Sequence, residues 1–420
     1  MSFTAGKRRA LVGPPGRGFS PDYLEVDRGT PGRGLTPDRI QRGWGGVHQG
    51  SYISFLSWLD MTAETPAGGQ VPRGCFNLKY EVWVHPYNWT DDNANSARRL
   101  GDTVAAAANS MRRFERLGYR TLKPILVTHS MGGLVARAYT QLHGGGGDVH
   151  GVIHGAMPTD GSPATYKRMR AGFEGVESQV LGRNQSESTA TAGNLPGPLE
   201  LLPNGRHRSV NGTTNWLRGT GQGGGRLWAR PAANPYGEIY VNQADWWRLI
   251  YRQYLDPDGD PDGRSAFRQS RTQIIAAASY HSRLGSSGYH PNTRMFYAAD
   301  RGHPCWDHIE WRQTSRVDTP SNAQPQRNDE NGTVEWGRWS DPVYTPYGAN
   351  PPVFIADTRY EIQEPDAPGD GTVHAGSGKY VSGPMSVPTR NGFVHQSAFD
   401  LGEARRFVSE WLFAMVQEQL

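Results

Sequence analysis

Residues 122–143 read LKPILVTHSMGGLVARAYTQLH and join a short apolar run to an amphipathic segment through a serine turn. The run over 122–128 is typical of a buried strand, and the apolar spacing from Met131 to His143 predicts a helix. Glycines at 144–147 end that helix, and a second apolar run follows over 149–154. Strand, turn, helix and strand in this order indicate a parallel sheet with crossover helices, and so an α/β fold.

Segments on both sides of this stretch continue the pattern. Helices are predicted over 44–60 and 93–119, the second with Asn93 as its N-cap, and the alternation in 80–85 predicts a strand between them. Strand character returns at 293–299. The chain ends in a predicted helix over 401–418, and its apolar residues form one stripe that should pack on the sheet: Ala404, Phe407, Val408, Trp411, Leu412 and Met415.

The composition of the 420 residues excludes several classes of protein. Hydrophobic residues make up 36% of the chain and the mean hydropathy is −0.66, while 53 glycines and 30 prolines indicate much loop. No apolar run approaches the roughly 20 residues that a membrane-spanning helix requires. The net charge of +4 comes from 44 basic and 40 acidic residues spread along the chain, which argues against a nucleic-acid-binding protein.

The rhythm of strands and helices suggests one domain with a large insertion. Residues 1–40, rich in Gly, Pro and Arg, are predicted to form an extended N-terminal arm. Residues 41–170 and 291–420 are predicted to be the two halves of the α/β core. Between them, 171–290 lose the rhythm and are interpreted as an inserted lid or cap, and 301–350 are a further polar excursion.

Ser130 is the candidate nucleophile, because it stands at a sharp turn from strand to helix that exposes its hydroxyl. Small residues two before and two after the serine let strand and helix approach closely; Gly132 is one of them, whereas Thr128 departs from the usual glycine. The backbone N–H of Met131 would point at the oxyanion that develops when Ser130 attacks a carbonyl group.

His395 is the candidate general base, since it lies in a loop directly before the last amphipathic helix. It would take the proton of Ser130 and return it to the leaving group. His374 and His303 are the competing candidates.

Asp370 is the candidate acid that orients the histidine. It lies in the glycine turn Gly369-Asp370-Gly371, which can present a carboxylate, 25 residues before His395. Asp300, at the end of the strand predicted over 293–299, is the competitor.

The second oxyanion donor is not apparent. It normally comes from a loop after an early strand, and Ala10–Gly13 is the one strand-like fragment near the N-terminus. Either that loop is built differently, or the natural chain extends further at this end.

Two further patterns remain open. The acidic run from Asp256 to Gly263 resembles the start of a calcium loop, but Gln269 stands where such loops have a bidentate glutamate, so a solvated acidic turn is the alternative. No cofactor is required by the expected chemistry. Cys75 and Cys305 are either two free thiols or one bridge.

Several blocks of this sequence resemble a known family. The elbow over 125–137 is similar to that of α/β-hydrolase lipases, and the block GVIHGAMP at 151–158 with GSP at 161–163 is more particular. Together with RGWG at 42–45, Tyr52 and GDGTV at 369–373, they resemble the third family of type VI secretion lipase effectors, which are antibacterial phospholipases.

The resemblance implies an α/β-hydrolase with Ser130, Asp370 and His395 as its triad. It also implies membrane phospholipids of a rival's periplasm as substrate, delivery through a secretion spike protein, and a cognate immunity protein. The absence of an apparent signal peptide agrees with export through a needle. An acyltransferase or a soluble carboxylesterase would use the same triad, and a non-catalytic binding module is the remaining alternative.

Overall fold

The computed structural model describes residues 4–13, 35–64, 80–314, 324–340, 342–345 and 348–420. They form two compact units. The parallel-sheet unit consists of Pro21–Thr159, Ser279–Cys305 and Asp366–Leu420. The aromatic unit consists of Met1–Ser20, Asp160–Ala278 and Trp306–Pro365.

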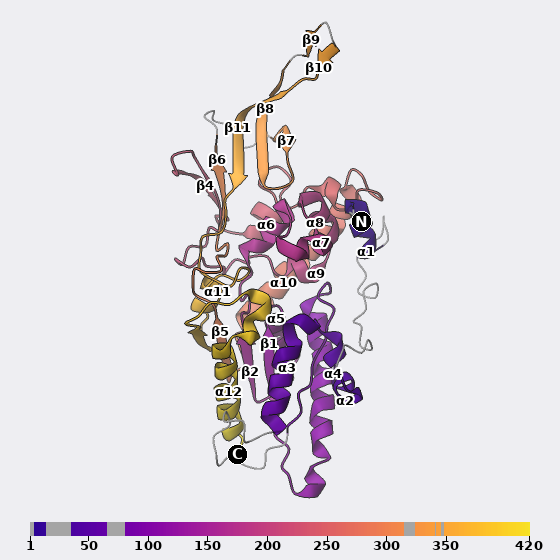
Figure 1. The fold of residues 1–420 in the computed structure, drawn as a ribbon, viewed down its shortest axis with the longest axis vertical. Coiled ribbons are helices and arrows are strands. Elements are labelled where there is room, and N and C mark those ends of the chain that lie inside the picture. The colour runs from indigo at the N-terminus through magenta and orange to yellow at the C-terminus, as the bar shows by residue number, and fades with distance from the viewer. Residues whose placement is uncertain (1–3, 14–34, 65–79, 315–323, 341, 346–347) are drawn as a thin grey trace. The chain divides into compact units, whose positions relative to one another are not determined.

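The parallel-sheet unit contains a four-stranded sheet in the order β1-β2-β5-β12 (Figure 1). All its pairs are parallel, and Thr128 on β1 lies opposite His154 on β2. The prediction of an α/β fold with a mostly parallel sheet is therefore confirmed. The strands are β1 (Ile125–His129), β2 (Gly151–Gly155), β5 (Thr293–Tyr297) and β12 (Met385–Pro388).

Helices cover both faces of this sheet. Successive side chains of a strand point to opposite faces, so Ile153 and His154 of β2 mark the two sides. Ile153 shares a core cluster with Phe55 of α3 and Val408 of α12, whereas His154 lies against Gly133 of α5. The helices of this unit are α2 (Pro37–Gln41), α3 (Gln49–Glu64), α4 (Asn93–Arg112), α5 (Gly132–Leu142), α11 (Gly376–Lys379) and α12 (Gly402–Gln417).

The stripe predicted on the last helix is largely buried. Leu412 is only partly buried, and the rest of the stripe is buried: Ala404, Phe407, Val408, Trp411 and Met415. At about 25 cal/mol per Å² of buried apolar surface, such a stripe stabilises the helix against the sheet by several kcal/mol. The helix therefore holds the loop before it in place.

The aromatic unit is built around a six-stranded sheet in the order β4-β3-β6-β11-β8-β7. Its pairs are antiparallel except β3 with β6. The strands are β3 (Leu217–Thr220), β4 (Arg226–Arg230), β6 (Ile309–Gln313), β7 (Arg327–Asn328), β8 (Thr333–Trp339) and β11 (Phe354–Ile362), and β9 (Val343–Thr345) pairs with β10 (Gly348–Asn350) (Figure 1).

The helices of the aromatic unit are mostly short. They are α1 (Ala5–Leu11), α6 (Pro163–Ala171), α7 (Ser178–Leu181), α8 (Gln185–Ala192) and α9 (Pro196–Leu199). The long helix α10 (Arg264–Ser287) begins in this unit and ends in the parallel-sheet unit. None of the helices in the described ranges is long and apolar enough to cross a membrane.

Two local predictions need correction. The region 301–350, interpreted as a polar excursion, contains strands β6 to β10. Most of these strands are short, and β6 pairs with β3 and β11, which come from other segments of the chain, so the sequence pattern did not reveal them. The segment 80–85 is extended but is not a strand, because Val84 N–H donates to Arg42 O and Val82 O accepts from Trp44. Those bonds replace the ladder of a neighbouring strand.

The N-terminal region also differs from the prediction. Ala10, part of the strand-like fragment, lies in helix α1, and α2 is a second helix within the expected arm. Asp92 rather than Asn93 caps α4, since its carboxylate accepts the N–H of Ala94 at 2.6 Å. The aromatic unit takes two of its three parts from Asp160–Ala278 and Trp306–Pro365, and the insertion placed at 171–290 from the sequence stays a prediction.

Candidate active site

The turn between β1 and α5 holds Ser130 in a strained conformation. Its φ is +52°, a left-handed value that non-glycine residues rarely adopt and that is typical of a nucleophile elbow. The Ser130 N–H donates to Gly155 O of β2 at 3.0 Å, which fixes the turn at the end of the sheet. The hydroxyl is thereby carried away from both the strand and the helix.

Close packing at the elbow depends on Gly133 more than on Gly132. A Cβ at Gly133 would lie 2.6 Å from Met157 Sδ, closer than real Cβ contacts come, whereas at Gly132 the nearest atom would be 3.8 Å away. Thr128, the departure from the usual glycine, uses its hydroxyl: Oγ1 lies 2.7 Å from His154 Nδ1. The strand side of the elbow therefore accepts a threonine because it has a polar partner.

His395 lies in hydrogen-bonding contact with Ser130. The distance from His395 Nε2 to Ser130 Oγ is 2.8 Å, although the two residues are 265 apart in the sequence. His395 is the first residue of a 3₁₀ turn (His395–Asp400) that leads into α12, and it is buried. This contact is the one that proton transfer from the hydroxyl requires.

Asp370 completes the arrangement from the other side of the imidazole. Its Oδ2 lies 2.8 Å from His395 Nδ1, and its Oδ1 accepts the N–H groups of Thr372 and Val373 at 3.0 and 2.7 Å. Burial raises the pKa of Asp370, but His395 and the two backbone donors together lower it further, so the pKa lies below its ordinary value. The buried carboxylate therefore stays ionised and can stabilise an imidazolium.

The competing residues Asp300 and His303 accept from the turn that carries Asp370 through their backbone oxygens, and their side chains have other partners. Asp300 Oδ1 accepts the N–H of Gly302 at 3.0 Å, and His303 Nδ1 lies 3.8 Å from the same carboxylate. The structure therefore brings together Ser130, His395 and Asp370, the three residues that the sequence placed first.

Sequence reasoning gave no role to His129, which precedes the nucleophile. Its Nε2 lies 2.9 Å from the backbone oxygen of His395, and its Nδ1 lies 2.7 Å from the hydroxyl of Tyr52 on α3. Burial first, and then repulsion from His395, lower the pKa of His129 to about 3. The sequence signal for such a role was a histidine at a strand end beside a candidate nucleophile. Its partners are more than 70 residues away in the sequence, so the pattern could not identify them.

Met131 is placed where an oxyanion donor is expected, between Ser130 and the first residue of α5. The N-terminus of α5 adds its positive end to that position. Tyr87, half-buried, approaches the same turn: its hydroxyl would be 3.8 Å from a Cβ on Gly132. Burial raises the pKa of Tyr87, so this hydroxyl keeps its proton.

A cavity of about 1090 Å³ lies along β1 within the parallel-sheet unit. Its lining includes His129 and Gly132, on either side of Ser130, and also Leu122 and Lys123. Its wall is mostly apolar and includes Leu56, Leu59, Val104, Ala107, Met111, Val127 and Leu412. Pockets of roughly 300–1,000 Å³ hold drug-sized ligands, so this space suffices for a long apolar group.

The acidic run considered for calcium forms a turn before α10. Asp256 accepts the N–H of Gly259, Asp260 that of Ala266, and Asp262 that of Arg264. These carboxylates are thus used as caps of their own loop and of the following helix. Cys75, the possible partner of Cys305 in a bridge, lies outside the described residues.

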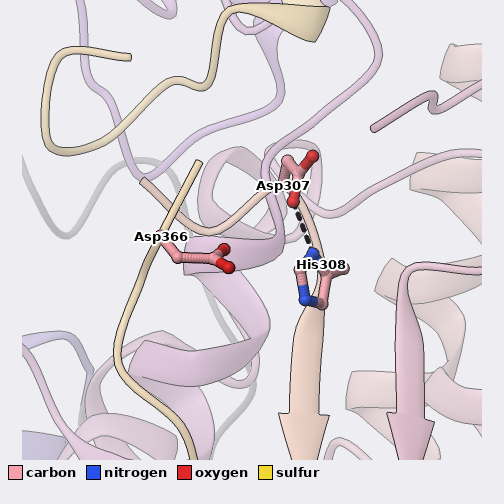
Figure 2. A group of neighbouring side chains, drawn as sticks. All are labelled: Asp307, His308 and Asp366. Atoms are coloured by element: carbon pink, nitrogen blue, oxygen red, sulfur yellow. Dashed lines mark hydrogen bonds and ion pairs between the residues drawn. The ribbon is translucent and has the colours of Figure 1, made fainter. Parts of the chain in front are cut away.

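Figure 2 shows Asp307, His308 and Asp366, three side chains of types that bind metal ions. His308 Nδ1 is 2.5 Å from Asp307 Oδ1, and Asp307 Oδ2 accepts the N–H of Val210 at 2.8 Å. Asp366 belongs to the other unit, so we assign no metal site to this group.

Comparisons with known proteins agree with this architecture. No protein-family model matches the chain, and no curated protein matches it in sequence. A solved structure titled as the Tle4-Tli4 complex, a type VI secretion lipase effector with its immunity protein, matches with a TM-score of 0.75 and 26% identity over 99% of this chain and 90% of that chain. Phospholipase PlaB from Legionella pneumophila also matches, at 12% identity over 76% of this chain and 79% of that chain. Its TM-score of 0.22 is too low to indicate a shared fold.

The solved structure bears out the resemblance noted in the sequence. The effector in that structure is Tle4, whereas the sequence motifs suggested the third family of these effectors. The chain therefore has an α/β-hydrolase fold and resembles, over nearly its whole length, a lipase effector of the type VI secretion system.

Proposed function

We propose that the chain is a serine-dependent lipase or phospholipase that hydrolyses ester bonds of membrane glycerophospholipids. The observation that carries the proposal is the continuous hydrogen-bonded series from Asp370 through His395 to Ser130, with both distances at 2.8 Å, on a strained elbow. A serine hydroxyl is a weak nucleophile unless an adjacent base activates it, and this arrangement provides the base.

In the proposed reaction, Ser130 Oγ attacks the ester carbonyl while His395 Nε2 takes its proton. The Met131 N–H stabilises the oxyanion, and Asp370 stabilises the imidazolium. His395 then protonates the leaving alcohol, which departs and leaves an acyl group on Ser130. Water, deprotonated by His395, releases the fatty acid and restores the serine.

Two observations support a lipid as the substrate. The cavity along β1 is mostly apolar and is lined by His129 and Gly132, the neighbours of Ser130, so we infer that it receives the acyl part of an ester. The Tle4-Tli4 structure, which matches this chain at 26% identity and a TM-score of 0.75, is that of a lipase effector. A small water-soluble ester would not need an apolar space of this size.

The wider role that we propose follows from the same neighbour. The Tle4 structure was solved together with Tli4, so we infer that this chain is an antibacterial toxin with a cognate immunity protein of its own. We further propose that a type VI secretion needle delivers the chain through a spike protein, and that the chain acts on membrane phospholipids from the periplasm of the target cell. Growth arrest when the chain is directed to the periplasm, but not when it stays in the cytoplasm, is the expected result.

Hydrolysis of phospholipid vesicles tests the enzymatic proposal. Wild-type protein should release fatty acid and lysophospholipid, and Ser130→Ala should release neither above background. Ser178→Ala removes a serine of the aromatic unit and serves as the matched control, with wild-type rates expected. Equal activity of wild type and Ser130→Ala would exclude the proposal, and acyl transfer to an added alcohol in place of hydrolysis would favour an acyltransferase.

A further inference from the structure

His129 is a half-buried histidine beside the nucleophile that the proposed reaction does not use. Its ring lies 4.9 Å from the ring of His395, yet neither of its nitrogens bonds the triad side chains. Instead, Nε2 contacts the backbone oxygen of His395 and Nδ1 contacts the Tyr52 hydroxyl. Both nitrogens of the ring thus have partners, on two elements that are distant in the sequence.

The chemistry of the partners fixes the direction of both bonds. A backbone oxygen can only accept, so His129 Nε2 must carry a hydrogen and donate it. A neutral imidazole then has Nδ1 as its acceptor, so Tyr52 donates its hydroxyl hydrogen. The series therefore runs from the Tyr52 hydroxyl through the His129 ring to the backbone oxygen of His395.

We propose that Tyr52 and His129 are positioning residues that hold the backbone of His395 against the nucleophile elbow. This inference rests on the proposed function, since it assigns these side chains a part in the same reaction. Neither residue touches the reacting atoms. They act through His395, whose ring must meet Ser130 on one side and Asp370 on the other.

The backbone of His395 is held on both sides of its Cα. Its N–H donates to the backbone oxygen of Asp370 at 2.9 Å, and its own oxygen accepts from His129. The first bond ties the histidine to the acid, and the second ties it to the residue next to Ser130. Together these two bonds link the segments that carry Asp370, His395 and His129. The ring of His395 is bonded to Asp370 and to Ser130, each at 2.8 Å.

The neutral state of His129 is part of this arrangement. A protonated ring would carry hydrogens on both nitrogens, and Tyr52 could then no longer donate to it. It would also place a positive charge beside His395, which must itself become positive during the reaction. Burial and the proximity of His395 keep the pKa of His129 at about 3, so the ring stays neutral at any physiological pH.

An ordinary core histidine is the alternative, and it predicts a different result. In that case removing His129 would lower stability without changing the rate per folded molecule. A positioning residue, in contrast, would change kcat and the environment of His395. His207 provides the comparison, because it is a buried histidine of the aromatic unit whose Nε2 lies 3.1 Å from a backbone oxygen, that of Asp307.

The test compares His129→Phe, His129→Gln, Tyr52→Phe and His207→Phe in the full chain. The readouts are kcat and KM on a short-chain ester, the folded fraction, and nitrogen NMR of the His395 ring. His129→Phe should lower kcat by about 100-fold with KM nearly unchanged, because a misplacement of about 1 Å can cost that much. His129→Gln retains an N–H that can reach the backbone oxygen, so it should recover much of the rate, and Tyr52→Phe should cost less than His129→Phe.

The outcomes separate this inference from the proposed function. If wild-type protein neither hydrolyses esters nor reacts with a fluorophosphonate, the proposed function fails. If wild type is active and His129→Phe has wild-type kcat per folded molecule, or loses no more than His207→Phe, the positioning role is overturned. Should His129→Phe not fold, His129→Gln and Tyr52→Phe still decide. A shifted His395 resonance in the His129 variants, but not in His207→Phe, is the supporting signature.

Discussion

The two units bury polar side chains for different purposes. In the parallel-sheet unit, the buried Asp370 and His395 and the half-buried His129 form hydrogen bonds that converge on Ser130 and its neighbours. In the aromatic unit, the buried guanidinium of Arg170 donates to the backbone oxygen of Trp246 and lies over the ring of Trp311. We infer that polar burial in the first unit positions groups for the proposed reaction, whereas in the second it fills a structural core.

The apolar cores of the two units also differ, in the types of residue that form them. The parallel-sheet unit packs aliphatic and phenylalanine side chains from α3, α12 and the strands. The core of the aromatic unit contains six tryptophans and three tyrosines beside its aliphatic residues: Trp216, Trp246, Trp247, Trp306, Trp311, Trp336, Tyr166, Tyr240 and Tyr360. Substitutions in the first unit's polar network should therefore change the rate, and substitutions in the second unit's core should change stability.

The largest expected effect is on the rate. Asp370→Asn keeps the shape of the side chain but removes the charge that stabilises the His395 imidazolium, so kcat should fall by about 10⁴-fold. Ester hydrolysis measured beside near-UV circular dichroism checks this. Near wild-type kcat in a folded Asp370→Asn would contradict the assignment of the acid.

Substitution of a core tryptophan in the aromatic unit should lower stability rather than the rate. Trp311→Ala removes a fully buried ring that packs against Trp246 and donates to the Tyr166 hydroxyl, so it should lower the free energy of unfolding by about 3–5 kcal/mol. Trp339→Ala, whose side chain is 60% exposed, is the control and should change it by no more than about 0.5 kcal/mol. Urea unfolding gives both values, and the comparison between units fails if Trp311→Ala lowers kcat per folded molecule instead.

An ionised glutamate should make the aromatic unit sensitive to acid. Burial raises the pKa of Glu310, but hydrogen bonds from Arg218, Arg312 and Thr220 outweigh burial and lower it to about 2. Because the folded-state pKa lies below the unfolded one, the stabilisation is present above about pH 4.5 and is lost as the pH falls toward 2. It amounts to about 3 kcal/mol at neutral pH.

Glu310→Gln should remove this dependence on pH. The control is Glu410→Gln, which breaks the exposed ion pair with Arg406 and should cost no more than about 1 kcal/mol at any pH. Unfolding curves measured at several pH values compare the two. Parallel curves for wild type and Glu310→Gln would show that this carboxylate does not stabilise the folded state.

The smallest effect concerns the choice of substrate. Ala107 lines the cavity from α4, so Ala107→Phe should obstruct a long acyl chain while leaving room for a short one. The rate on a palmitoyl ester should fall by about tenfold, or about 1.4 kcal/mol, with little change on an acetyl ester. Ala106→Phe, on the exposed side of the same helix, is the matched control. Equal loss on both esters would mean that the acyl chain lies elsewhere.

The sequence predicted the parallel-sheet unit well because its signals are local. The strand before Ser130, the helix after it and the final amphipathic helix each show their own periodicity, and the elbow defines where the nucleophile stands. The loop positions of Asp370 and His395 then follow from the order of residues in this fold class. The structure places these three residues in contact, as expected.

The aromatic unit was not predictable in the same way. Its sheet combines strands from two separate segments, and the pair of β3 with β6 joins residues about 90 positions apart. Short strands with polar connections have no periodicity of their own, so their partners cannot be found locally. The contacts of His129 were missed for the same reason, because the Tyr52 hydroxyl and the backbone oxygen of His395 come from distant segments.

We propose that Ser130 is the activated nucleophile of the chain. Reaction of the purified protein with a fluorophosphonate, followed by peptide mass spectrometry, tests it most directly. We predict one adduct, on Ser130, which is absent from Ser130→Ala and forms much more slowly on Asp370→Asn. An adduct on another serine, or none on wild-type protein that hydrolyses esters, would contradict this account.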